Sequence, residues 1–237
     1  MKILAIDSSS IVATVAIIDN DTIVAQYTIN HKKTHSQTLL PMIDEIVKMS
    51  ELDLSDIDAI AVSGGPGSFT GLRIGSATAK GLGLALKKPL IHIPTMDGLA
   101  YNMCWTAKYV CPMMDARRNQ VYTGLYHFEN QKLVCDIPQC QSDINELIEK
   151  INKLGKAVVF LGDGAKVYED VIKKNTKVDL EFAPPHLSMQ NASAFAALAV
   201  TYYNEGKLET AMEHEPDYLR KSQAERELEE KMKSNNE

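Results

Sequence analysis

The sequence contains few cysteines, a single tryptophan and no long apolar segment. Its cysteines form no C-x-x-C pair and no zinc spacing; they are Cys104, Cys111, Cys135 and Cys140. This pattern predicts free thiols rather than a disulfide framework or a structural zinc. The first apolar run is short and is interrupted by Asp7, which is unlike a signal peptide, and no run reaches the ~20 residues of a transmembrane helix. We therefore expect a cytoplasmic protein that does not contact a membrane.

An excess of basic residues is also missing. The 237 residues include 25 Lys and Arg against 31 Asp and Glu, so the net charge is −6. Such a surface does not attract nucleic acid as a whole, and any contact with RNA would need a local basic patch or the surface of a partner. With 45% hydrophobic residues, the chain can fold as one large domain or two small ones.

Hydrophobic patterns predict the same order of elements twice. In the first half, apolar or β-branched runs predict strands and helical spacing predicts helices, the strands at residues 3–6, 12–18, 23–29, 59–62 and 90–93 and the helices at 36–49, 72–86 and 96–103. In the second half, the same patterns predict strands at 109–114, 121–128, 132–140 and 157–161 and helices after Ser142, through 171–172 and at 192–203. Ser36 and Ser142 are the expected N-caps.

The repeated order, βββαβα in each half, indicates an α/β protein with a duplicated actin-like (ASKHA or RNase H-like) fold. Each half opens with a strand that ends in an aspartate, Asp7 or Asp115. We expect one half at residues 1–107 and the other at 108–217, with the last helix (about 191–204) packing back on the first half, followed by a charged tail at 218–237. The fold alone does not give the function.

Six stretches resemble the bacterial TsaB (YeaZ) family. In order they are AIDSSSIVATVAIID, HSQTLLPMIDEIV, SGGPGSFTGLRIGSATAKGLGLAL, PTMDGLA, PMMDARRNQVY and PDYLR, between residue 1 and about residue 220. The resemblance implies a non-catalytic subunit of the complex that forms N6-threonylcarbamoyladenosine beside the anticodon of tRNAs. It implies pairing with a TsaD-type catalytic subunit of similar fold, a TsaE-type ATPase in the same complex and only indirect contact with tRNA. Whether the chain also forms a homodimer stays open.

The glycine-rich stretch SGGPGSFTGLR, residues 63–73, matches no nucleotide-binding motif. A P-loop needs Lys and Ser or Thr where Leu72 and Arg73 stand, and Thr70 replaces the third glycine of G-x-G-x-x-G. Asp7, Ser9 and Gly67 are candidates for a nucleotide site, although tight turns use the same residue types.

The second hairpin, DARRN at residues 115–119, lacks the glycines that nucleotide-using members of this fold place there. We therefore expect no catalytic residue and no cofactor. The alternative function is an actin-like ATPase or phosphotransferase with its own nucleotide site.

The chain lacks histidines at the two positions where a metal site would be expected. TsaD paralogues carry a His-x-x-x-His pair where this chain has Thr95 and Leu99, and the chain's own His31 and His35 lie elsewhere, at a predicted helix start. We expect no metal, and a metallopeptidase is the least favoured function because it would need those histidines.

Small residues recur every four positions along the helix that follows the glycine-rich stretch. Glycine inside a helix costs about 1 kcal/mol relative to alanine, so close packing must offset the loss. The packing partner is either the chain's own sheet or another subunit, and the resemblance implies pairing through this helix and the one at 36–49. The predicted partner-interface residues are Leu39, Ile43, Gly71, Arg73, Gly75, Ala79 and Gly83.

Overall fold

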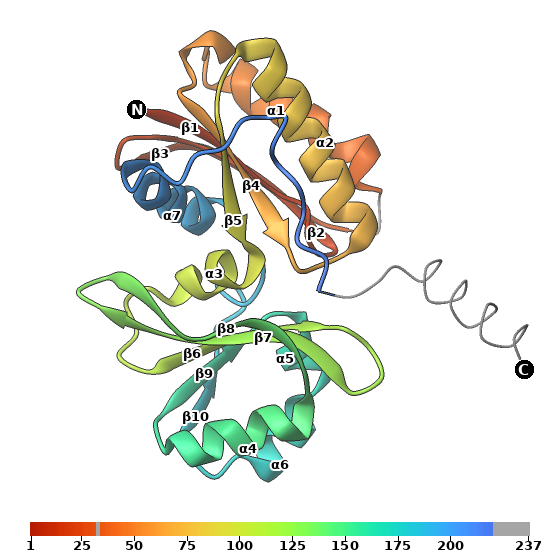
Figure 1. Cartoon of the computed structure of the whole chain (residues 1–237), viewed down its shortest axis with the longest axis vertical. Helices are drawn as coiled ribbons and strands as arrows, with labels where there is room; N and C mark the ends of the chain where they lie inside the picture. The colour runs from red at the N-terminus through yellow and green to blue at the C-terminus, as the bar shows by residue number, and fades with distance from the viewer. Residues whose placement is uncertain (32–33, 220–237) are drawn as a thin grey trace, which may run out of the picture.

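The computed structural model describes residues 1–31 and 34–219, which form two lobes (Figure 1). The sheet of the first lobe has the strand order β3-β2-β1-β4-β5, with β1 (Lys2–Asp7), β2 (Val12–Asp19), β3 (Thr22–Asn30), β4 (Ala59–Gly65) and β5 (Leu90–Pro94). The sheet of the second lobe has the order β8-β7-β6-β9-β10, with β6 (Tyr109–Asp115), β7 (Gln120–Glu129), β8 (Lys132–Asp143), β9 (Val158–Leu161) and β10 (Leu180–Phe182).

The two sheets repeat one topology. The central strand pairs antiparallel with the second strand and parallel with the fourth in both lobes. β1 is a continuous apolar run because helices cover both faces of its sheet, so that Ile3, Leu4, Ala5 and Ile6 are fully buried. The predicted duplicated actin-like α/β fold is confirmed.

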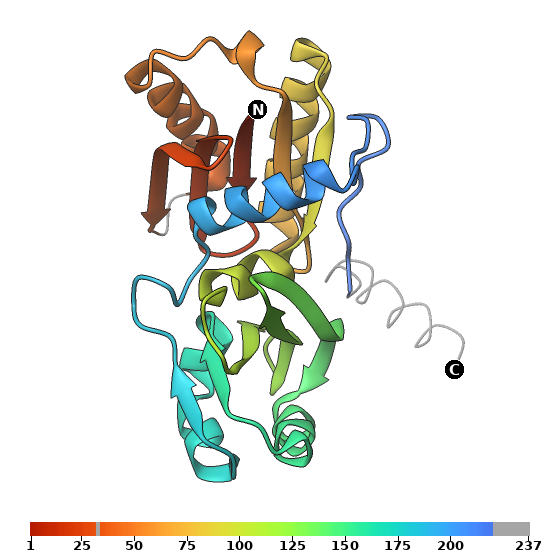
Figure 2. The same ribbon diagram turned by 90° about the vertical axis from the view of Figure 1, so that its left-hand side faces the viewer.

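Helices cover both faces of each sheet. One face of the first sheet packs against α1 (His35–Met49) and α2 (Phe69–Leu86), and one face of the second packs against α4 (Ile144–Leu154), α5 (Asp163–Val167) and α6 (Glu169–Asn175). The other face of the first sheet packs against α7 (Ala192–Asn204), although this helix comes from the end of the chain (Figure 2). The other face of the second sheet packs against α3 (Thr95–Ala100), which comes from the first half. Each half therefore gives its last helix to the opposite sheet.

The structure differs from the predicted elements at several ends. α1 begins at His35, after Thr34 as N-cap, so Ser36 lies inside the helix. α4 is capped by Asp143, whose carboxylate accepts a hydrogen bond from the Asn145 amide, and not by Ser142. β10, the split between α5 and α6, and the short 3-10 helices η1 (Leu54–Asp56) and η2 (Tyr101–Met103) had no clear sequence signal. The predicted tail lies outside the described residues from position 220 onward.

One buried carboxylate connects elements from both lobes. Asp97, on α3, accepts hydrogen bonds from the hydroxyl of Tyr126 on β7 at 2.8 Å and from the hydroxyl of Tyr202 on α7 at 2.7 Å. Burial raises the pKa of Asp97, and the two hydroxyl groups partly oppose that shift. The exchanged helices are thus joined by hydrogen bonds as well as by apolar packing.

We expect Tyr202→Phe to lower the free energy of unfolding by about 1–3 kcal/mol, because it removes one of the two hydroxyl groups that satisfy a buried carboxylate. Urea denaturation of the variant and the wild type measures the loss. Tyr203→Phe, one residue further along α7, is the control for removal of a hydroxyl group. Equal losses in the two variants would contradict the role given to Tyr202.

Candidate functional site

The glycine-rich turn between β4 and α2 packs directly on the hairpin between β1 and β2. A Cβ atom on Gly67 would lie 2.4 Å from the carbonyl oxygen of Ser9, and one on Gly71 would lie 2.1 Å from that of Ser8. The Ser68 amide donates a hydrogen bond to the Ser9 carbonyl at 2.6 Å, and the Ser8 hydroxyl donates to the Gly71 carbonyl at 2.9 Å. These glycines are required for contact within the chain, because any side chain would overlap the hairpin.

The three candidates for a nucleotide site lie together in this contact. Asp7 is 3% exposed, and its carboxylate accepts a hydrogen bond from the Ser9 amide at 2.8 Å. Ser9 is fully buried under Gly67. Burial raises the pKa of Asp7, and the hydrogen bond from the Ser9 amide and the charge of His35 partly oppose this shift. The amide that a phosphate would need is already used by Asp7, so a phosphate could bind only if the turn moved.

The second lobe repeats this contact with different residues. A Cβ atom on Gly162, where φ is +93°, would lie 2.0 Å from the carbonyl oxygen of Met113. The Asp115 carboxylate accepts a hydrogen bond from the Arg117 amide at 2.8 Å, as Asp7 does from the amide two residues ahead. Tyr168 also donates its hydroxyl to Asp115 at 3.2 Å. In both lobes, therefore, an amide of the first hairpin donates a hydrogen bond to the aspartate that ends the strand before it. We call such a hairpin closed.

The hairpin of the second lobe has an unusual backbone. Arg117, Arg118 and Asn119 have φ values of +63°, +55° and +61°, in the left-handed region that residues other than glycine seldom adopt. The Ala116 amide donates a hydrogen bond to the Gln120 carbonyl and closes the turn at 2.9 Å. Both arginines and Asn119 are exposed. None of the three positions is a glycine, so this backbone could not be predicted from the residue types.

The structure places six of the seven predicted partner-interface residues inside the chain's own core. Buried on the inner faces of α1 and α2 are Leu39, Ile43, Gly71, Gly75, Ala79 and Gly83. A Cβ atom on Gly75 would lie 2.4 Å from the Ser8 hydroxyl oxygen, and one on Gly83 would lie 3.0 Å from Leu90. In the described chain these six residues pack against their own lobe, and their role in a partner interface stays a prediction. Arg73 alone is exposed, with its guanidinium 4.0 Å above the Phe69 ring.

The opposite faces of the same two helices expose apolar and small residues. Leu40 and Leu84 are each 55% exposed, and a pocket of about 210 Å³ between α1 and α2 is lined by His35, Ser36, Leu39, Leu40, Ile74, Ala77 and Thr78. Nothing lies within 4 Å of a Cβ atom added to Gly81. We call Leu40, Ile74, Ala77, Gly81 and Leu84 the outer α1–α2 face. The spacing of residues 77, 81 and 84 could have indicated it, but the buried glycines have the same helical spacing.

The fold and the two closed hairpins define a duplicated actin-like chain, and a family model described as TsaD, tRNA N6-adenosine threonylcarbamoyltransferase, matches residues 22–228. The chain is 32% identical to the tRNA threonylcarbamoyladenosine biosynthesis protein TsaB of Bacillus subtilis, over 95% of this chain and 96% of that protein. It is also 32% identical to the TsaB of Escherichia coli, over 94% of this chain and 96% of that protein. The chain belongs to the TsaB family.

Solved structures show the same fold. A Pseudomonas aeruginosa protein described as similar to peptidase YeaZ superposes with a TM-score of 0.77 at 24% identity, covering 92% of this chain and 99% of that one. YeaZ from the same organism gives a TM-score of 0.75 at 23% identity, with the same coverage. Within residues 1–31 and 34–219, no helix has the length and apolar character needed to cross a membrane.

We expect Asp7→Asn to change the pH dependence of stability. Because burial raises the pKa of Asp7 in the folded state, the protonated carboxyl stabilises the fold at low pH, and this contribution is lost as the pH rises through the raised pKa. The variant carries no ionisable group at this position. Its free energy of unfolding relative to the wild type should therefore increase from about pH 4 towards pH 7.

Urea denaturation of both proteins at a series of pH values tests this expectation. Asp53→Asn is the control, since the hydrogen bonds from Ser55 lower the pKa of that exposed carboxyl and should give the opposite trend. A difference between Asp7→Asn and the wild type that stays constant with pH would contradict the assignment.

Proposed function

We propose that this chain is a non-catalytic subunit in the formation of N6-threonylcarbamoyladenosine in tRNA, and that it acts by pairing with a TsaD-type catalytic subunit. Its TsaB relatives are described as tRNA threonylcarbamoyladenosine biosynthesis proteins. The model of the transferase itself matches most of the chain. A subunit that shares the fold of the catalytic subunit can offer it a matching face, as related chains do in pseudo-symmetric pairs.

The outer α1–α2 face is the observation that supports the pairing. Gly81 lies exposed in the interior of α2, where no neighbour within the described chain requires a glycine. Its cost of about 1 kcal/mol relative to alanine is explained if another helix approaches closely there. Leu40, Ala77 and Leu84 add exposed apolar surface on the same side, which is typical of a protein interface.

The two closed hairpins support a role without catalysis. Asp7 and Asp115 accept hydrogen bonds from amides of their own turns, and Ser8 and Ser9 are fully buried. The net charge of −6 fits contact with tRNA through the complex rather than by this chain alone. A TsaE-type ATPase belongs to the same proposal. A homodimer through the outer α1–α2 face would compete with the heterodimer, because both would use one surface.

Pairing is tested with Gly81→Leu. We expect the dissociation constant for the purified TsaD-type subunit to rise ten- to hundredfold, since a leucine in a close helix contact costs about 1–3 kcal/mol. The free energy of unfolding should not fall, because Gly81 has open space around it and leucine is the better helix former. Isothermal titration calorimetry and urea denaturation on the same protein give both values.

Two further variants make the pairing test specific. Gly75→Leu should lower the free energy of unfolding, because its side chain would overlap the Ser8 hydroxyl. Glu149→Leu adds a leucine to the exposed side of α4 in the other lobe and should leave pairing unchanged. Unchanged affinity in Gly81→Leu, or an equal loss in Glu149→Leu, would refute the outer α1–α2 face as the interface.

The absence of catalysis has its own test. We expect the isolated chain to hydrolyse no ATP above background and to transfer no threonylcarbamoyl group, whereas addition of the chain to the other subunits should raise their activity. The reason is that both hairpins are closed. Steady-state ATP turnover by the isolated chain that disappears in Asp7→Asn would overturn the proposal in favour of an ATPase.

A further inference from the structure

The segment that follows α7 returns to the first lobe and is fixed there by backbone hydrogen bonds. Leu90, on β5, and Glu209 exchange two such bonds, at 2.8 Å and 3.0 Å, and the Asp217 amide donates to the Gly64 carbonyl at 2.6 Å. The ammonium group of Lys80 on α2 donates to the His214 carbonyl at 2.8 Å. We call residues 205–219 the C-terminal segment. Its side chains are therefore held in defined positions beside β5.

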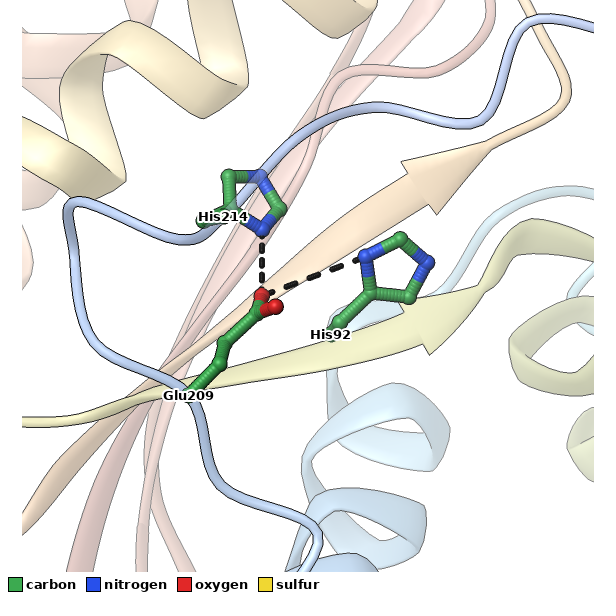
Figure 3. Close-up of side chains that lie close together, drawn as sticks. All are labelled: His92, Glu209 and His214. Carbon is green, nitrogen blue, oxygen red and sulfur yellow. Dashed lines mark hydrogen bonds and ion pairs between the residues drawn. The ribbon is translucent and has the colours of Figure 1, made fainter.

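Three potential metal ligands meet where this segment crosses β5 (Figure 3). Glu209 and His214 come from the C-terminal segment and His92 comes from β5. One carboxylate oxygen of Glu209 lies 2.5 Å from Nδ1 of His214 and 3.9 Å from Nδ1 of His92. One ligand atom from each residue lies within 4.8 Å of the others. The cluster joins two parts of the chain that are far apart in sequence.

A second carboxylate orients the His92 ring. Asp217 Oδ2 lies 3.1 Å from Nε2 of His92, which favours the tautomer with its proton on Nε2. The lone pair of Nδ1 then faces the Glu209 oxygen, and two acceptors face each other with no hydrogen between them. A carboxylate that holds the far nitrogen of a histidine is the usual second shell of a metal-bound imidazole. A cation between His92 and Glu209 would pair with both acceptors.

His214 supplies its ligand atom from a fully buried position. The residue is 0% exposed, and its Nε2 has no hydrogen-bond partner within residues 1–31 and 34–219. A fully buried imidazole held by one carboxylate alone is incompletely satisfied, which needs a physical reason. Nε2 is the nitrogen that does not face Glu209, so a cation at Nδ1 would leave it unpaired. What the buried ring contributes to the site is Nδ1 held beside the Glu209 oxygen. His92 and Glu209 are 22% and 25% exposed at their side chains, so an ion and a water molecule can reach the cluster from solvent.

We propose that His92, Glu209 and His214 bind one divalent transition-metal ion of the zinc class, through Nδ1, a carboxylate oxygen and Nδ1, and that the ion fastens the C-terminal segment to β5. Two imidazoles and one carboxylate favour Zn²⁺ over Mg²⁺ or Ca²⁺, which prefer oxygen ligands. With metal–ligand bonds of about 2.0–2.2 Å, ligand atoms lie about 3.3 Å apart in a tetrahedral site. Small side-chain rotations reach this geometry from the observed 2.5 Å and 3.9 Å. The fourth position is open to water.

The site is tested on the full chain after dialysis against a chelator. We expect titration with ZnCl₂ to show one ion bound per chain, and titration with CoCl₂ to give the ligand-field absorption of a low-coordinate nitrogen and oxygen site. Glu209→Gln and His92→Gln should each weaken Zn²⁺ binding at least tenfold, because each removes a ligand. His31→Gln is the matched control, since His31 belongs to the His-x-x-x-His sequence on the other side of the lobe.

Stability supplies a second readout that does not depend on activity. Zn²⁺ should raise the thermal midpoint of the wild type and of His31→Gln, and should not raise that of Glu209→Gln or His92→Gln, because only a bound ion adds stability by mass action. The metal-free midpoints of the variants show whether they fold. Absence of stoichiometric Zn²⁺ binding, or binding that survives in both ligand variants, would overturn the proposal. Loss of binding in His31→Gln alone would assign the ion to the other histidine pair.

Discussion

In both lobes, backbone lies against backbone where a strand turns into a helix beside the first hairpin. The turn around Gly67 and Gly71 contacts Ser8 and Ser9 in the first lobe, and the turn around Gly162 contacts Met113 in the second. These distances leave no volume for a Cβ atom, so glycine at these positions is a steric requirement of the fold. The positions of α2 and α5 on their sheets follow from this contact, and in the first lobe so does the burial of Asp7.

The two hairpins also use amide groups that a phosphate site would need. A phosphate site needs free amide groups and an open approach, and here the amides of Ser9 and Arg117 bind the carboxylates of their own hairpins. The exposed side of α1 and α2 combines a pocket with leucines and an exposed glycine, and its properties suit another protein better than a small molecule.

The spacing of apolar residues made most of the fold predictable, because a strand or helix that buries one face carries apolar residues at a regular interval. The N-caps differ from the expected ones by two residues at α1, where Thr34 replaces Ser36, and by one at α4, where Asp143 replaces Ser142. All four are residue types that favour this position. Because α2 carries small residues on two faces, spacing alone does not say which face is buried, and the six residues named for the partner interface lie on the buried faces of α1 and α2. The cluster of His92, Glu209 and His214 could not be predicted from the sequence. Its members share no local motif and come together only because the C-terminal segment returns to β5.

The exchange of last helices between the halves has a consequence for the order in which the protein matures on the ribosome. The sheet of the first lobe is complete once β5 has been made, but the helix that covers its second face, α7, spans Ala192–Asn204. Until then the apolar surface formed by Ile3, Ala5, Ile91 and Ile93 has no native cover. Because synthesis runs from the N-terminus, the first lobe cannot be completed before α7 has emerged, so one apolar face of its sheet stays uncovered while residues 95–191 are made. Such transiently exposed apolar surface favours aggregation of the nascent chain.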